Sequence, residues 1–127
     1  MQTNQASSDL RSDEPINADA AHAISLIDLP IAIRRAAHQT ASARAEWEMA
    51  YGHYRERQRA LILYYHRDQG LGISAAEMKA EIDPSVIDAS QYSLGLKQRV
   101  AAFEAAERHL LQEFQAKLIL AQAEPNR

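Results

Sequence analysis

The stretch that decides the fold is the forty-residue run from Pro30 to Gln69, PIAIRRAAHQTASARAEWEMAYGHYRERQRALILYYHRDQ. It opens with a proline, contains one glycine and no further proline, and is followed by Gly70. These are the boundary residues of one long helix. At about 1.5 Å per residue, such a helix extends about 60 Å, which exceeds the width of a small domain. It therefore needs a packing partner of similar length.

A second run, from Pro84 to Ala123, has a similar length and no internal proline. The two runs predict an all-α fold, a long antiparallel helical hairpin. Between them, residues 74–77 (SAAE) match the capping box in which a serine and a glutamate satisfy free backbone donors at a helix start. Pro84 disfavours helical geometry at Asp83, so the connector is predicted to hold a short helix over Ala75 to Ile82.

The rest of the chain divides by composition. Residues 1–16 are polar and acidic and lack apolar periodicity, which predicts a disordered acidic tail. Residues 17–123 are predicted to form a single helical-hairpin domain, and residues 124–127 a short second tail. Asn17 is placed to cap a short helix over residues 18–27 before the first long helix begins.

Both long runs repeat packing positions at alternating spacings of three and four residues, as in a coiled coil. The predicted row of the first helix is Ile33, Ala37, Thr40, Arg44, Trp47, Tyr51, Tyr54, Gln58, Leu61 and Tyr65. The predicted row of the second is Val86, Ala89, Ser93, Leu96, Val100, Phe103, Glu107, Leu110, Phe114, Lys117 and Ala121. Leu63 and Tyr64 lie off the first row and are candidates for contact with the connector or another subunit. Because the seam is rich in alanine and therefore thin, we expect a homo-oligomer.

Composition narrows the classes of function. The chain is 46% hydrophobic and has no cysteine, which excludes disulfides and thiolate metal sites. No stretch approaches the roughly 18–20 apolar residues of a membrane span, so we expect a cytoplasmic protein without membrane contact. Five histidines occur, but none belongs to a helical metal-binding pair. Without a glycine-rich phosphate loop or a nucleophile motif, we expect neither an enzyme nor a cofactor.

Positive charge gathers in the first long helix, where residues 34–67 hold seven arginines and three glutamates within a chain of net charge -3. Arginine side chains can track a phosphate backbone and tyrosine rings can stack on bases, so this pairing suits single-stranded nucleic acid. The candidate binding residues are Arg44, Tyr51, Tyr54, Arg55, Arg59 and Arg67. Arg57 points away from the strip that carries Arg55 and Arg59.

A different interpretation assigns the same residues to structure. Aromatic residues at this spacing commonly form the core of a hairpin, and flanking arginines commonly pair with acids of the partner helix. The available acids are Glu104, Glu107 and Glu113. The position of the arginines discriminates between the two interpretations, because pairing of Arg55 and Arg59 with these glutamates would leave no positive charge for phosphate.

The order of parts around the connector adds a family resemblance. A basic helix ends in LYYHR at residues 63–67 before a glycine, and is followed by Glu77-Met78-Lys79 and then by a long helix. This order, from about Trp47 to Ala121, resembles the phage recombination-mediator family (UvsY-like). The resemblance implies a ring-shaped homo-oligomer of helical hairpins that binds single-stranded DNA and helps load a strand-exchange recombinase in place of single-strand-binding protein. Arg59 matches a basic position of the family, whereas Leu61 and the acidic N-terminal extension depart from its pattern.

We therefore expect a non-enzymatic single-stranded-DNA-binding accessory protein, similar to a recombination mediator and of phage or mobile-element origin. Its expected partners are single-stranded DNA and a recombinase or single-strand-binding protein. The alternative is a helical-hairpin interaction or structural protein without nucleic-acid binding, such as a phage accessory or inhibitor protein that binds a host protein.

Overall fold

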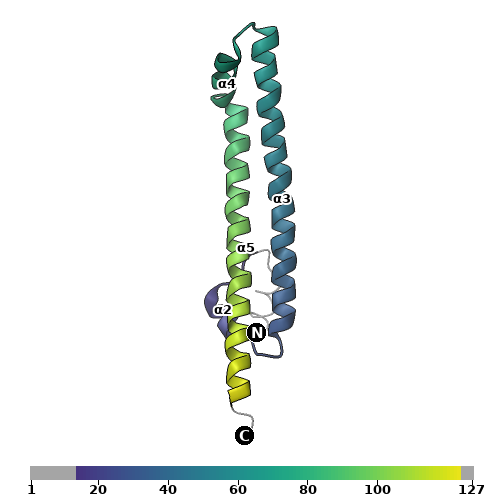
Figure 1. Ribbon diagram of the computed structural model, residues 1–127, viewed down its shortest axis with the longest axis vertical. Helices are drawn as coiled ribbons and strands as arrows, with labels where there is room; N and C mark the ends of the chain where they lie inside the picture. The colour runs from purple at the N-terminus through teal and green to yellow at the C-terminus, as the bar shows by residue number, and fades with distance from the viewer. Residues whose placement is uncertain (1–13, 124–127) are drawn as a thin grey trace, which may run out of the picture. The chain divides into compact units, whose positions relative to one another are not determined.

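The computed structural model describes residues 14–123, and in that range it contains helices and no strand. The elements are α2 (Ala18–Ala23), α3 (Leu29–Leu63), the π-helical turn η1 (Tyr64–Asp68), α4 (Ile73–Glu81) and α5 (Pro84–Ala123) (Figure 1). The long helix formed by α3 and η1 packs against α5, which confirms the predicted helical hairpin. Apart from residues 14–16, the predicted tails lie outside the described residues.

Helix α2 begins where its cap was predicted, since the Asn17 side chain accepts a hydrogen bond of 2.8 Å from the Ala20 amide. It ends at Ala23, four residues before the predicted end. Ser25 accounts for the difference, because its hydroxyl donates to Asp28 and its carbonyl accepts from the amides of Asp28 and Leu29. This turn gives the backbone an alternative to the helix and leads directly into α3.

At its far end the long helix widens into one π turn before it stops. The Gln69 amide donates to the carbonyl of Tyr64, and the Leu71 amide donates to the carbonyl of Tyr65. Gly70 has a φ of 71°, in the left-handed region that glycine adopts without a steric penalty. Gly70 therefore reverses the chain, as predicted.

The connector helix starts earlier than predicted, and the predicted capping box does not form. Helix α4 begins at Ile73, where the Gly72 carbonyl accepts from the Ala76 amide and no side chain caps the helix. Ser74 is consequently the second residue inside the helix and cannot act as its cap. The next helix start is as predicted, because Asp83 accepts hydrogen bonds from the backbone and the side chain of Ser85 beside Pro84.

Contacts divide the chain into two compact units, and both long helices pass through each of them. In the described range, unit 1 consists of residues 14–43 and 99–123. Its core joins α2, the start of α3 and the later part of α5. The buried members are Ala21, Ile24, Leu29, Ala32, Ala36 and Leu110. Leu29 and Leu110 are the large side chains that this part of the structure buries completely, so the core of unit 1 is thin.

Charged contacts fasten α2 to α5 within unit 1. The Nδ1 atom of His22 lies 3.0 Å from Oε1 of Glu113. One turn further along α5, the ammonium group of Lys117 donates to the carbonyls of His22 and Ile24 at the end of α2. A cation at this position satisfies carbonyls that a helix C-terminus leaves without partners.

Unit 2 consists of Arg44–Gln98 and contains the later part of α3, η1, α4 and the start of α5. Small residues dominate its buried positions, which are Ala50, Ala76, Ala80, Val86 and Ser93. Helix α4 places its two fully buried alanines inward and packs on η1. The ammonium group of Lys79 on α4 lies 5.2 Å from the ring centroid of Tyr65, which adds a cation–π contact to this packing.

The predicted packing row is right along α5 and partly wrong along α3. On α5, Ala121 is the member of the predicted row that proves exposed. On α3, the predicted Ala37, Arg44 and Tyr51 are exposed, and the residue before each of them is buried instead: Ala36, Ala43 and Ala50. Alanine lets two helix backbones approach closely, so the alanines lie on the line of contact between the helices and the larger Arg44 and Tyr51 lie beside it.

Candidate nucleic-acid interface

Three aromatic side chains form a ladder on α3 in unit 2. The ring centroids of Trp47 and Tyr51 are 5.8 Å apart, and those of Tyr51 and Tyr54 are 6.0 Å apart, with tilted planes. Spacings of four and three residues keep the rings on one side of the helix. Trp47 and Tyr54 are half-buried, whereas Tyr51 is 43% exposed. Tyr51 is therefore the ring of this ladder most accessible to a base.

Cations lie beside this ladder from both long helices. The guanidinium carbon of Arg55 is 6.0 Å from the ring centroid of Tyr51. From α5, the ammonium nitrogen of Lys97 is 5.9 Å from the ring centroid of Trp47. Both distances are at the outer limit of a cation–π contact, so neither ring face is tightly occupied. Aromatic faces next to cations are the chemistry that binds single-stranded nucleic acid without reading its sequence.

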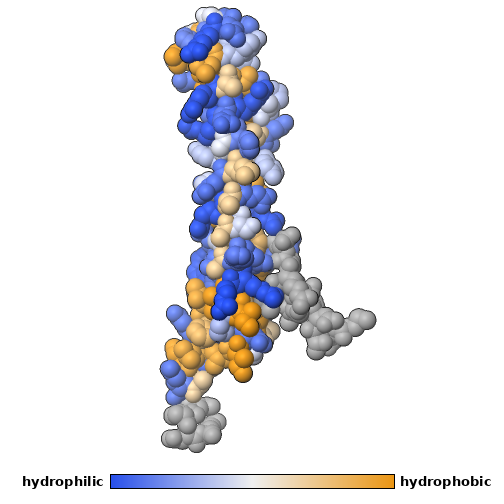
Figure 2. Space-filling model, turned by 90° about the vertical axis from the view of Figure 1, so that its right-hand side faces the viewer, coloured by the Kyte–Doolittle hydropathy of each residue, from blue (hydrophilic) through white to orange (hydrophobic). Residues whose placement is uncertain are grey.

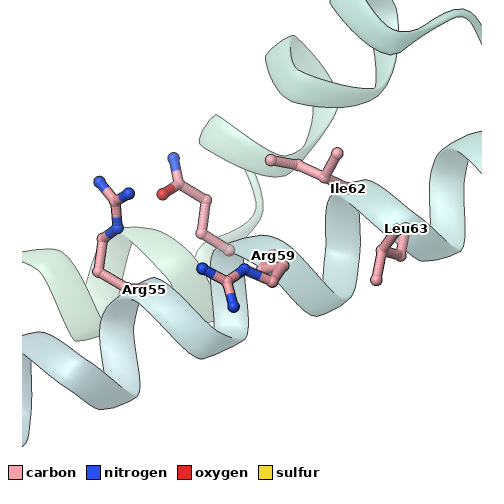
Figure 3. Close-up of a pocket in the computed structure, with 5 residues that line it drawn as sticks. Arg55, Arg59, Ile62 and Leu63 are labelled. Carbon is pink, nitrogen blue, oxygen red and sulfur yellow. The ribbon is translucent and has the colours of Figure 1, made fainter.

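A shallow groove continues from Arg55 along α3. Figure 3 shows Arg55 and Arg59 on successive turns of the helix, with Ile62 and Leu63 on the turn that follows. Gln58 completes the lining, and the volume is about 170 Å³. Sites for small molecules usually enclose about 300–1,000 Å³, so this open groove suits a chain that lies along the surface better than an enclosed ligand.

The arginines that line the groove are not paired with carboxylates. Within residues 14–123, neither Arg55 nor Arg59 forms an ion pair. The acids proposed as their alternative partners do not reach them, and Glu113 is instead bonded to His22 and Lys117. The arrangement that would have removed this positive charge is therefore not present.

The other predicted arginines behave differently from this pair. Arg44 is exposed and already has an interaction partner. Arg67 is exposed on the π turn and does not line the groove. The Nε of Arg57 donates a hydrogen bond of 2.9 Å to the Ser85 hydroxyl, so this side chain is directed towards the start of α5, and it does not line the groove. The structure thus brings together Tyr51, Tyr54, Arg55 and Arg59.

The predicted row of the first helix already placed Trp47 with Tyr51 and Tyr54, but the sequence did not indicate the position of Lys97 beside Trp47. Trp47 was predicted only as a packing residue. Lys97 lies fifty residues away in the chain, and its approach depends on the register between the two long helices. Helix periodicity within one run contains no information about that register, so no signal in the sequence singles out Lys97.

One titratable group near the start of α5 has a shifted pKa. The Ser85 side chain and then the Ser85 amide donate to Asp83 and lower the pKa of its carboxyl group, and the positive charge of Arg57 acts in the same direction. Hydrogen bonds that favour the ionised carboxylate have this effect. Asp83 therefore stabilises the helix start as an anion.

Among the described residues, no group of three or more His, Asp or Glu side chains is arranged to hold a metal ion. None of the described helices has a stretch long and apolar enough to cross a bilayer. Comparisons with protein-family models, curated proteins and solved structures found no match to this chain.

Proposed function

We propose that this chain is a non-enzymatic accessory protein that binds single-stranded DNA through the flank of α3 in unit 2. The proposal rests on one observation, that Arg55 and Arg59 lack carboxylate partners beside the exposed ring of Tyr51. Guanidinium groups without partners are available for phosphate oxygens, which they can bind through two parallel hydrogen bonds.

In the proposed complex, Arg55 and Arg59 hold the backbone of the strand. They are one helical turn apart, about 6 Å along the axis, so each engages its own phosphate. A base stacks on Tyr51, whose ring face Arg55 approaches only at 6.0 Å. Lys97 beside Trp47 supplies a further cation at the other end of the aromatic ladder. Stacking and phosphate contacts of this kind tolerate any base, so binding is expected to be independent of sequence.

The negative net charge of the chain makes the proposed binding sensitive to the loss of individual cations. Because the chain carries a net charge of -3, diffuse electrostatics oppose its approach to DNA. Binding must then depend on a few local cations, and the loss of two of them should have a measurable effect. For single strands, log K falls against log salt with a slope of about -0.7 for each phosphate neutralised.

The experiment measures fluorescence anisotropy of a labelled oligo-dT over a salt series. The double change Arg55→Gln with Arg59→Gln should flatten the salt slope by about 1.4 and weaken binding to all sequences alike. Arg57→Gln is unsuitable as a control, because it would also remove the hydrogen bond to Ser85. The matched control is Arg34→Gln with Arg108→Gln, which removes the same charge from exposed positions of unit 1.

The control should keep the wild-type slope. If it lowers affinity and slope as much as the double change at Arg55 and Arg59 does, only diffuse charge matters and the proposed strip is wrong. Preference for an oligo-rU of equal length would identify RNA as the ligand and overturn the assignment to DNA. If the wild type shows no salt-sensitive binding to single strands, the proposal fails as a whole.

The finer proposal is a cytoplasmic, self-associating recombination mediator of phage or mobile-element origin, on the basis of the resemblance across the connector. It requires a recombinase and single-strand-binding protein as partners. The decisive measurement is recombinase assembly on DNA that is already coated with single-strand-binding protein. The chain should accelerate that assembly, and the Arg55 and Arg59 double variant should not.

A second candidate function, binding of a partner protein without nucleic acid, is favoured by the outer face of α4. The inner face of this helix buries Ala76 and Ala80, whereas Met78 on its other side and Ile82, its C-cap residue, are strongly exposed. Residues four apart share a face, so these two form an apolar contact surface of their own. Retention of a host protein by the wild type, with loss on Met78→Glu and without any single-strand binding, would support this candidate.

A further inference from the structure

The largest exposed aliphatic side chains of unit 1 gather where α3 begins and α5 ends. Figure 2 shows hydrophobic colour over the start of α3 and over the last turns of α5. We call this surface the end patch, and define it by its most exposed aliphatic residues: Ile27, Ile31, Leu118, Ile119 and Leu120. Ile27 is 86% exposed, and Ile119 and Leu120 are 64% and 66% exposed.

The last turns of α5 expose three consecutive aliphatic side chains. Leu118, Ile119 and Leu120 point in directions about 100° apart, so they cover more than half of the circumference of the helix. They are 37%, 64% and 66% exposed, which is unusual for large aliphatic residues next to one another. Unit 1 thus exposes as many large aliphatic side chains in the end patch as it buries large apolar side chains in its core, so a partner surface would extend that core.

Charge around the end patch fits a second copy of the same chain. Residues 118–123 carry no charge, and the nearest charges on α5, Glu113 and Lys117, are bonded inward to α2. The exposed Asp28 in the turn before α3 and the exposed Arg35 on α3 lie three residues before and four residues after Ile31. Opposite charges therefore lie on the two sides of Ile31 along the chain, and the Asp28 carboxylate also accepts a hydrogen bond from Ser25.

We propose that the end patch is the contact surface of a two-fold dimer. In a two-fold arrangement the same surface meets itself, with the helices running in opposite directions. Asp28 of one copy then lies opposite the partner subunit's Arg35, while the aliphatic side chains meet between them. Paired charges at the rim fix the orientation, and the uncharged centre lets two acidic chains meet without repulsion. This surface rests on the proposed self-association and is independent of the arginine strip in unit 2.

A lipid surface is the competing occupant, and the end patch has only part of the pattern that lipid insertion uses. Insertion into anionic membranes usually combines an apolar face with unpaired lysine or arginine residues and interfacial tryptophan. The exposed Arg34 and Arg35 follow Ile31 on α3, but Lys117 is committed to the carbonyls of α2, the single tryptophan lies in unit 2, and the carboxylate of Asp28 adjoins Ile27.

The test is the mass of the full chain by light scattering at micromolar concentration. The wild type should form dimers or an even-numbered assembly, and Ile119→Glu with Leu120→Glu should halve the mass with unchanged helicity. Ile73→Glu with Leu94→Glu is the matched control, because it places the same charges at comparably exposed aliphatic positions of unit 2. The control should keep the wild-type mass. If the end-patch variant keeps its mass, or if both variants lose it, the assignment of the surface is wrong.

Three further outcomes separate the possibilities. A wild-type monomer would overturn both self-association and this surface, while leaving DNA binding unaffected. A wild-type monomer that floats with phosphatidylglycerol vesicles would assign the end patch to lipid instead. Because the chain has no cysteine, Ile31→Cys offers a second test that needs no destabilising charge, at the position nearest the proposed two-fold axis. A short bismaleimide should link two Ile31→Cys copies and leave Leu94→Cys unlinked, and the reverse pattern would refute the proposed contact.

Discussion

Two adjacent leucines of α5 allow the packing of unit 1 to be tested with one kind of substitution. Leu110 is 1% exposed and belongs to the buried core, whereas Leu111 is 45% exposed. Leu110→Ala removes about three methylene equivalents, worth about 2.4 kcal/mol of transfer free energy, and leaves a cavity. The total loss of unfolding free energy should therefore be about 3–5 kcal/mol. Leu111→Ala should cost about 1 kcal/mol, because about half of its side chain is already in water.

The assay is urea unfolding followed by circular dichroism at 222 nm, with all variants at one protein concentration because the proposed self-association would add to stability. Both substitutions have the same helix propensity change and lie on the same helix, so the difference between them reports burial alone. Equal losses for the two variants, or a loss below about 1 kcal/mol for Leu110→Ala, would refute the core described for unit 1.

Two further predictions concern the boundaries of the helices. Asp83→Asn keeps a capping oxygen but removes the charge, so it should lower the melting temperature at pH 7. Hydrogen bonds from Ser85 lower the Asp83 pKa in the folded state. The stability advantage of the wild type over Asp83→Asn should therefore persist above the ordinary carboxyl pKa of 3.8 and vanish as the pH falls through the lower folded-state value. A stability advantage that grows in acid would contradict this prediction. Gly70→Ala should destabilise the protein by about 1–2 kcal/mol, because a side chain at a φ of 71° is strained even though nothing lies within 4 Å of the added carbon. Gly72→Ala, at a φ of -61°, is the control and should cost less in the same thermal melt; equal costs would show that the left-handed turn does not matter.

Local chemistry explains why most helix ends could be predicted from the sequence. Asn17, Gly70 and Asp83 each act through backbone groups within a few residues, so their effect does not depend on the rest of the fold. The capping box at Ser74 did not form for a similarly local reason. The Gly72 carbonyl accepts the first hydrogen bond of the helix, from the Ala76 amide, so Ser74 lies inside the helix. A residue inside a helix cannot cap it, whatever motif it completes.

Packing was predictable where the side chains differ in size and ambiguous where they do not. Along α5, buried residues such as Val100, Phe103 and Leu110 stand out from polar neighbours, and the predicted row is correct there. Along α3, Ala36 and Ala37 are identical in side chain, and only contact with the other helix decides which is buried. The cross-helix approach of Lys97 to Trp47 is unpredictable for the same reason, because it depends on register rather than composition.

The buried row of α3 lies one residue before the predicted row, and this difference also affects the candidate site. Had Tyr51 been on the contact line, as its spacing predicted, its ring would be part of the core and closed to a ligand. The structure buries Ala50 instead, and Tyr51 moves to the flank on which Arg55 lies. The row of buried alanines on α3 and the accessibility of the Tyr51 ring therefore have one cause, the close approach of the two helices that alanine allows. Ala50→Leu should force the helices apart locally. A change in the exposure of Tyr51 together with a change in affinity for oligo-dT would link the buried alanines of α3 to the proposed single-strand binding, and an unchanged affinity would separate the two.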